Sequence, residues 1–135
     1  MSQTKLQSQE VAIAKPSTNI YTFLTNLNNF QKLMPSEVSD WNSTETECNL
    51  TLKGMPSIGF MIIEQTPFTN IVYKGLGKLP AAVFLKVAIS ADGAEQCKAQ
   101  LFLEADLNPM LKMMVEKPLT KFLDVLAHNL TKMEV

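Results

Sequence analysis

The chain has 135 residues, a formal net charge of −1 and a pI near 5.8. It has no basic stripe, so its electrostatics do not favour a nucleic-acid partner. The length predicts one domain over residues 1–135, large enough for a core and a modest cavity. The ten N-terminal residues are polar, and no apolar run reaches the roughly 20 residues of a membrane span. We therefore expect no signal peptide, no membrane insertion and a cytoplasmic location.

Residues that could carry metal or nucleophilic chemistry are scarce. His128 is the only histidine, and Cys48 and Cys97 lie far apart without a CxxC motif. This set predicts no metal site, no cofactor and no conventional catalytic residue. Free cysteines are commonly buried, so we expect both thiols in the core of a protein from a reducing compartment.

The N-terminal third predicts one strand and two short helices. Residues 4–14 alternate weakly and end at Lys15-Pro16, which is typical of a strand. Ser17 is a candidate helix cap, and apolar residues from Ile20 to Leu27 follow at helical spacing. Asn28-Asn29 breaks this stripe, and a second short helix over Phe30–Met34 is stopped by Pro35.

The middle of the chain predicts a run of antiparallel strands. Alternating or apolar segments occupy residues 37–47, 48–53, 60–66, 70–76, 83–90 and 97–104. Asp92-Gly93 marks the turn of the last hairpin. Its apolar faces match when Leu85 lies opposite Leu101 and Val87 opposite Ala99, which requires a loop of odd length. Phe84 and Phe102 then face outward, either as mutual support or as part of a partner surface.

The segment 108–133 predicts one long helix. Asn108 can cap it and Pro109 suits its first position. Apolar residues recur at spacings of three and four from Leu111 to Met133, and at about 1.5 Å per residue the helix exceeds 30 Å. Pro118 lies inside it, and either widens a cavity or follows the curve of a sheet. Strands and helices are thus segregated, which predicts an α+β fold.

This order of elements resembles the START-like or SRPBCC superfamily, the helix-grip fold of polyketide cyclase-like and pollen-allergen-like proteins. The likeness lies in VAIAKPSTNIYTFLTNLNNFQKLMP near the start, MIIEQTPFTNIVY in the middle and residues 108–133 at the end. It implies a curved antiparallel sheet of about six or seven strands wrapped on the C-terminal helix, with two short helices after the first strand. Family enzymes place an acid, a histidine or an arginine on cavity-facing strands, and this chain offers few.

The resemblance also implies a ligand cavity between the sheet and the long helix. Its expected lining residues come from the strands, the long helix and the end of the second short helix: Leu33, Met34, Leu50, Leu52, Met61, Ile63, Tyr73, Val83, Leu85, Leu101, Leu103, Met110, Met114, Pro118 and Phe122. Methionine is flexible and suits both core gaps and surfaces that accept varied apolar ligands, so both interpretations stay open for Met61, Met110 and Met114.

Three hypotheses of function follow. The first is a non-enzymatic binding protein for a small apolar or amphipathic molecule, present as a monomer or weak homodimer. The second is a cyclase-like or hydrolase-like enzyme using Tyr73 or Glu64, which requires Glu64 to face inward. With Met61 and Ile63 facing the cavity, Glu64 faces out. The third hypothesis is a protein-interaction module of the same fold.

Overall fold

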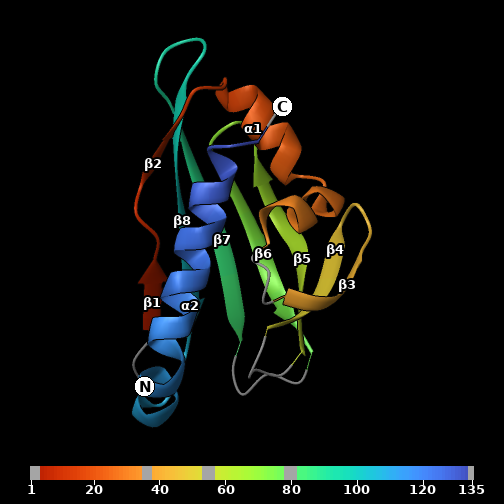
Figure 1. Cartoon of the computed structure of the whole chain (residues 1–135), viewed down its shortest axis with the longest axis vertical. Helices are drawn as coiled ribbons and strands as arrows, with labels where there is room; N and C mark the ends of the chain where they lie inside the picture. Colours follow the sequence, from red (N-terminus) through yellow and green to blue (C-terminus); the bar gives the residue numbers. More distant parts are fainter. Residues whose placement is uncertain (1–3, 35–37, 53–56, 78–81, 134–135) are drawn as a thin grey trace.

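The computed structural model describes residues 4–34, 38–52, 57–77 and 82–133. In sequence order its elements are β1 (Thr4–Gln7), β2 (Val11–Ile13), α1 (Ser17–Leu24), the 3-10 helix η1 (Leu27–Leu33), β3 (Val38–Ser43), β4 (Glu47–Leu52), β5 (Ser57–Thr66), β6 (Asn70–Leu76), β7 (Val83–Ala91), β8 (Cys97–Ala105) and α2 (Pro109–Leu130). The strands form one antiparallel sheet with the order β1-β8-β7-β6-β5-β4-β3, and β2 also pairs with β8. The predicted α+β class, with two short helices and a long C-terminal helix, is confirmed (Figure 1).

The sheet has eight strands because the predicted first strand is divided at Ser8. The Ser8 hydroxyl accepts a hydrogen bond from the backbone N–H of Leu101 at 3.0 Å, and the Ser8 N–H donates to the Leu101 carbonyl at 2.9 Å. The next N–H, that of Gln9, donates to the Asp124 carboxylate of α2 at 2.9 Å. A side chain and a helix thus satisfy backbone groups where the strand pairing is interrupted.

The two short helices form, but their boundaries differ from the prediction. Pro16 rather than Ser17 is the N-cap of α1, without a side-chain cap, and its carbonyl accepts from the N–H of Ile20 at 3.2 Å. The helix ends earlier than predicted, at Leu24, because the Asn26 side chain caps η1 by accepting from the Asn28 N–H at 3.0 Å. The predicted stop at Pro35 lies outside the described residues.

The last hairpin keeps the predicted faces in a shifted register. Leu85 lies opposite Leu103 and Val87 opposite Leu101, so the predicted pairs Leu85–Leu101 and Val87–Ala99 are wrong by two residues. The loop covers residues 92–96 and is closed by the Asp92 N–H donating to the Gln96 carbonyl at 2.9 Å. A loop of odd length was expected. The observed register differs from the predicted one by two residues. A shift of two changes every pair but leaves each side chain on the same face of the sheet.

The described part of β3 pairs on one side only, with β4, and it is irregular. Its register shifts between Ser39 and Asn42, and Asp40 within the shift has a φ of 53°. A positive φ is uncommon for residues other than glycine, and aspartate is among those that tolerate it best. This strand is therefore bent at one edge of the sheet.

The helices cover different parts of one face of the sheet (Figure 1). Helix α2 contacts β1, β2 and β8 and touches η1, whereas α1 contacts β6 and β7, and η1 contacts β3 and β4. The core between them includes Ile20, Phe30, Tyr73, Val87 and Leu126. Because α2 lies along the β1–β8 side, the side chains of its inner face decide how far the central strands are covered.

Candidate functional site: an apolar mouth beside helix α2

The inner face of α2 changes in burial along its length. Near the C-terminal end, Phe122, Leu123, Leu126, Ala127 and Leu130 are all buried. Toward the N-terminal end, Leu111, Val115 and Leu119 continue the same stripe but are only partly buried, although they pack against the core. Half of the helix therefore closes the core, and the other half presents apolar side chains at a boundary with solvent.

Three residues predicted to face the strands from α2 point away from them. Met110 and Met114 are 74% and 68% exposed, and Pro118 is also exposed. Each methionine precedes an inner residue, Leu111 or Val115, by one position, which turns it about 100° around the helix. The predicted inward orientation of Met110, Met114 and Pro118 is wrong. Phe122, predicted to face the strands, is buried.

Two predicted lining residues on β5 are also on the wrong face. Phe60 pairs with Cys48 and Ile62 with Tyr73, so these apolar residues face the core, whereas Met61 lies between Glu47 and Lys74 on the opposite face. The register shifts between Ile62 and Glu64, and Ile63 at this bulge is 47% exposed. Met61 and Ile63 are therefore on the outer face because they alternate with Phe60 and Ile62, and the bulge changes the face only of the residues that follow it.

The bulge also decides the position of Glu64. Glu64 pairs with Val72 and is exposed. Met61, Ile63 and Glu64 therefore all face outward. Regular alternation would place Ile63 and Glu64 on opposite faces, so this arrangement requires the bulge. The position of Glu64 does not favour the enzyme hypothesis in which it serves as a base.

Tyr73 is fully buried, and its hydroxyl already has a partner. It donates to the Leu24 carbonyl at the end of α1 at 2.8 Å, and its ring packs edge-on against Phe30 with centroids 5.1 Å apart. Burial raises the pKa of Tyr73 well above its ordinary value. The hydroxyl ties the sheet to α1, and this position does not favour a role in acid–base chemistry.

We expect Tyr73→Phe to lower the free energy of unfolding by about 1–3 kcal/mol, because the Leu24 carbonyl loses its buried donor. The matched control is Tyr21→Phe, which removes a hydroxyl bonded at 3.3 Å to the exposed side chain of Gln65. Urea unfolding of both variants measures the difference. Equal losses in the two variants would contradict the structural role assigned to Tyr73.

The other predicted lining residues lie mostly in the core. Leu33, Leu50, Val83, Leu85, Leu101 and Leu103 are buried. Met34 is partly buried at the end of η1. The backbone of Leu52 belongs to β4 and pairs with Val38, and its side chain lies outside the described residues. The sheet side of the predicted lining is thus largely on the predicted face, whereas on the helix side Phe122 is and Met110, Met114 and Pro118 are not.

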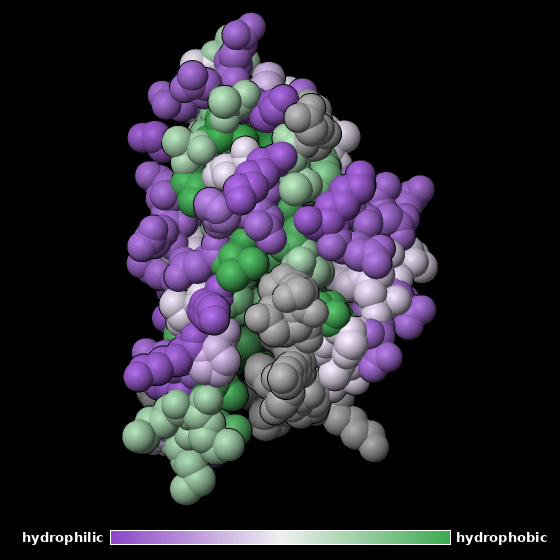
Figure 2. Space-filling view, viewed as in Figure 1, coloured by the Kyte–Doolittle hydropathy of each residue, from purple (hydrophilic) through white to green (hydrophobic). Residues whose placement is uncertain are grey.

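Partly buried apolar residues that pack against the core lie on α2, at the end of η1 and on strands β3 and β5. We call this set the apolar mouth; its members are Met34, Val38, Ile58, Leu111, Val115 and Leu119. Figure 2 shows patches of hydrophobic surface along the side of α2 that faces the β3–β4 part of the molecule. Neighbouring strands lie roughly 4.8 Å apart, so β8 under the helix and β5 are separated by about 14 Å.

The strand between them lacks a side chain on this face. Gly75 pairs with Phe60 and follows Tyr73 by two residues, so it belongs to the cavity-facing row of β6. Glycine has no Cβ, so Gly75 adds no side chain to this row. The prediction from sequence missed Gly75 and also Leu111, Val115 and Leu119. The three α2 residues could have been found from the apolar stripe of the helix, because this periodic pattern identifies the inner face more reliably than the positions of the methionines do.

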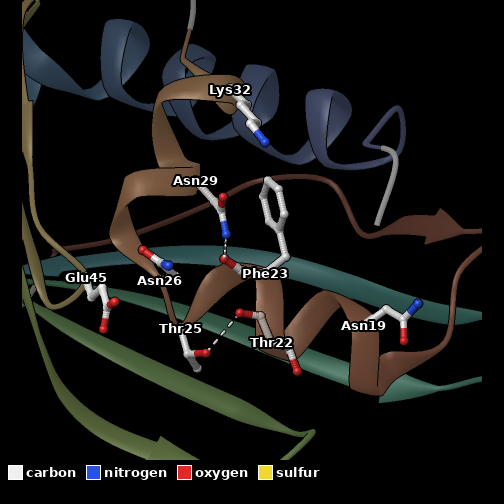
Figure 3. Close-up of a pocket in the computed structure, with 8 residues that line it drawn as sticks. All are labelled: Asn19, Thr22, Phe23, Thr25, Asn26, Asn29, Lys32 and Glu45. Atoms are coloured by element: carbon white, nitrogen blue, oxygen red, sulfur yellow. Dashed lines mark hydrogen bonds between the residues drawn. The ribbon is translucent and has the colours of Figure 1, made fainter.

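A second, polar depression lies beside α1 and η1 (Figure 3). It measures about 660 Å³, is wide open, and is lined by Asn19, Thr22, Phe23, Thr25, Asn26, Asn29, Lys32 and Glu45. Several of its polar groups are engaged by their own backbone. The Asn29 amide donates to the Phe23 carbonyl at 3.0 Å, and the Thr25 hydroxyl donates to the Thr22 carbonyl at 3.0 Å. These bonds serve the helix ends, so this depression is a weaker candidate than the apolar mouth.

The described residues contain no cluster of three or more His, Cys, Asp or Glu side chains that could hold a metal ion. In the same part of the chain, no helix is long and apolar enough to cross a membrane.

Cys48 and Cys97 are both buried and unpaired, as predicted. Burial raises the pKa of the Cys48 thiol to about 12 and also raises that of Cys97.

Comparison with known proteins rests on the fold. No family model and no curated protein matches the chain by sequence. Among solved structures, norcoclaurine synthase from Thalictrum flavum, in complex with dopamine and hydroxybenzaldehyde, has a TM-score of 0.74 at 13% identity, over 97% of this chain and 86% of that one. A START superfamily protein from Mycobacterium smegmatis has a TM-score of 0.71 at 14% identity, over 96% and 94% of the two chains.

This chain has the START-like, helix-grip fold. The START-like architecture extends to the di-domain ARO/CYC protein BexL from the BE-7585A biosynthetic pathway, with a TM-score of 0.66 at 14% identity over 96% of this chain and 46% of that one. This START-like chain therefore spans about half the length of BexL. Identities this low show a shared fold, and the resemblance expected from the sequence is confirmed at that level.

Proposed function

We propose that this START-like chain binds a small apolar or amphipathic molecule at the apolar mouth. The observation that carries the proposal is the change in burial along one stripe of α2: Phe122 and Leu126 are buried, whereas Leu111, Val115 and Leu119 are only partly buried. When an apolar ligand covers side chains that are in partial contact with water, the free energy falls by about 25 cal/mol per Å² of apolar surface buried.

The shape of the sheet supports the same proposal. On the cavity-facing row, Gly75 adds no side chain beside its partner Phe60. Ligand sites of this kind are concave and mostly apolar with few polar groups, which agrees with the residues of the mouth. A START-like neighbour, norcoclaurine synthase, was solved with two small aromatic molecules bound, which shows that the fold accommodates such ligands in that protein.

Binding without catalysis is favoured over the cyclase-like alternative. Glu64 points outward, and the Tyr73 hydroxyl is held by the Leu24 carbonyl. We further propose that the protein acts in the cytoplasm as a monomer or weak homodimer. Its two buried, unpaired thiols suit a reducing compartment.

A larger side chain on α2 that occupies the apolar mouth tests the proposal. We expect Val115→Trp to reduce the binding of an environment-sensitive hydrophobic dye at least about tenfold, because the larger side chain occupies the ligand's place. The matched control is Glu116→Trp, which adds the same side chain at an exposed position one residue further along α2. Fluorescence titration measures dye affinity, and circular dichroism verifies that both variants fold.

Native mass spectrometry of protein purified from its own host adds an independent measurement, because a retained ligand appears as extra mass. A wild-type chain that binds neither dye nor ligand would overturn the proposal. So would equal dye affinities for Val115→Trp and Glu116→Trp in folded protein.

A further inference from the structure

The outer face of α2 carries an exposed cluster of methionines at its N-terminal end. Met110, Met113 and Met114 are 74%, 82% and 68% exposed. They lie at positions i, i+3 and i+4, so they share one side of the helix. Figure 2 shows them as a pale hydrophobic patch at the end of the molecule where α2 begins. Three neighbouring exposed apolar side chains at a protruding helix end require an explanation.

The same side of α2 is basic behind this patch. Lys117 and Lys121 follow Met113 and Met114 at further helical spacings and are exposed. At about 1.5 Å per residue they lie roughly 6 Å and 12 Å from Met113 along the axis. Between residues 110 and 121 the chain has three lysines, including Lys112, and one carboxylate, Glu116. This segment is positively charged in a protein whose net charge is −1.

We propose that the N-terminal end of α2 docks on an anionic lipid surface. Met110, Met113 and Met114 enter the boundary between headgroups and acyl chains, and Lys117 and Lys121 contact anionic headgroups. Apolar side chains of membrane-docked helices reach about 5–10 Å into this boundary. When the end of α2 enters first, Lys117 stays at the level of the headgroups, because it lies roughly 6 Å behind Met113 along the helix axis. The flexible lysine stems let the charged ends remain among the headgroups.

A second protein copy is a less suitable occupant of this patch. The lysines behind the methionines would bring like charges together across a symmetric interface between two copies. An anionic lipid surface instead offers opposite charge beside an apolar interior, and it accepts flexible methionine side chains without a shape-matched pocket. Peripheral docking of this kind requires no membrane-spanning helix.

The docking proposal goes beyond ligand binding and stands without it. Leu111 and Val115 of the mouth lie about 100° around the helix from Met110 and Met114, on a side that packs against the core. The two proposals therefore assign different sides of one helix segment, and variants can separate them. Docking would bring the mouth close to a source of apolar molecules.

The test measures flotation of the purified chain with vesicles of phosphatidylcholine, alone or mixed with phosphatidylglycerol. We expect binding to the mixed vesicles, weakened by high salt because surface charges are then screened. Met110→Ser/Met113→Ser/Met114→Ser and, separately, Lys117→Gln/Lys121→Gln should each weaken binding about tenfold or more. Val115→Trp should leave flotation unchanged while it lowers dye binding, so failure of one proposal is distinguishable from failure of the other.

Matched controls alter similar side chains elsewhere. Ile63→Ser/Phe68→Ser removes two exposed apolar residues, and Lys74→Gln/Lys98→Gln removes two exposed lysines; neither should change flotation. The proposal is overturned if wild type does not float with the mixed vesicles, or if the controls lose binding as the α2 variants do. It is also overturned if light scattering shows a dimer that the methionine variant abolishes while vesicle binding persists.

Discussion

Replacing Phe122 with alanine is expected to lower the free energy of unfolding by about 3–5 kcal/mol. Phe122 is buried on the inner face of α2, where this helix closes the core. Removing its ring deletes apolar contacts and leaves a cavity that its neighbours fill only in part. Urea unfolding of wild type and variant measures the change.

The control for this prediction is Met114→Ala. It also removes a large apolar side chain from α2, but from a position that is 68% exposed. Its effect should stay within about 0.5 kcal/mol, as is usual for surface substitutions. A loss below about 1 kcal/mol at Phe122, or losses of similar size at both positions, would mean that the face of α2 is wrongly assigned.

The second large effect is a loss of stability at alkaline pH. Burial raises the pKa of Cys48 to about 12, whereas the thiol of an unfolded chain has an ordinary value of 9.0. Between these values the unfolded state has released its proton and the folded state keeps it, so stability falls as pH rises. At about 1.4 kcal/mol per pKa unit, Cys48 alone removes on the order of 4 kcal/mol by pH 12. Tyr73 and Cys97, whose pKa values are also raised by burial, add in the same direction.

Urea unfolding at a series of pH values from 8 to 11 measures this loss. Cys48→Ala is the informative variant, because it removes one titrating group and should flatten the dependence above pH 9. A stability that stays constant across this range in the wild-type protein would contradict the prediction. So would a variant that keeps the full slope, since the loss would then come from other groups.

The long helix and its start could be predicted from the sequence because the signals are local. Asn108 caps α2, accepting from the Leu111 N–H at 2.9 Å, and Pro109 begins the helix as expected. The faces of β7 and β8 were also predicted correctly, since alternation alone determines them. Their register was not, because the length of the loop at residues 92–96 depends on turn closure rather than on apolar pattern.

The bulge in β5 could not be predicted, because Met61, Ile62 and Ile63 are all apolar and satisfy either face. Only the pairing of Ile62 with Tyr73 and of Glu64 with Val72 reveals the added residue. On α2, the methionines were assigned by composition, although the stripe from Leu111 to Phe122 already defined a different face. Residue type was therefore a poorer guide to the site than position in the periodic pattern.

The irregular edge strand β3 has a consequence for the protein's behaviour at high concentration. A straight edge strand offers a row of unpaired N–H and carbonyl groups on which another chain can add a strand, the first step of sheet-mediated aggregation. The register shift around Asp40 bends that row and places a charge within it. At the opposite edge, β8 is covered by β1 and β2. The irregularity around Asp40 thereby hinders edge-to-edge pairing of β3 strands from two molecules.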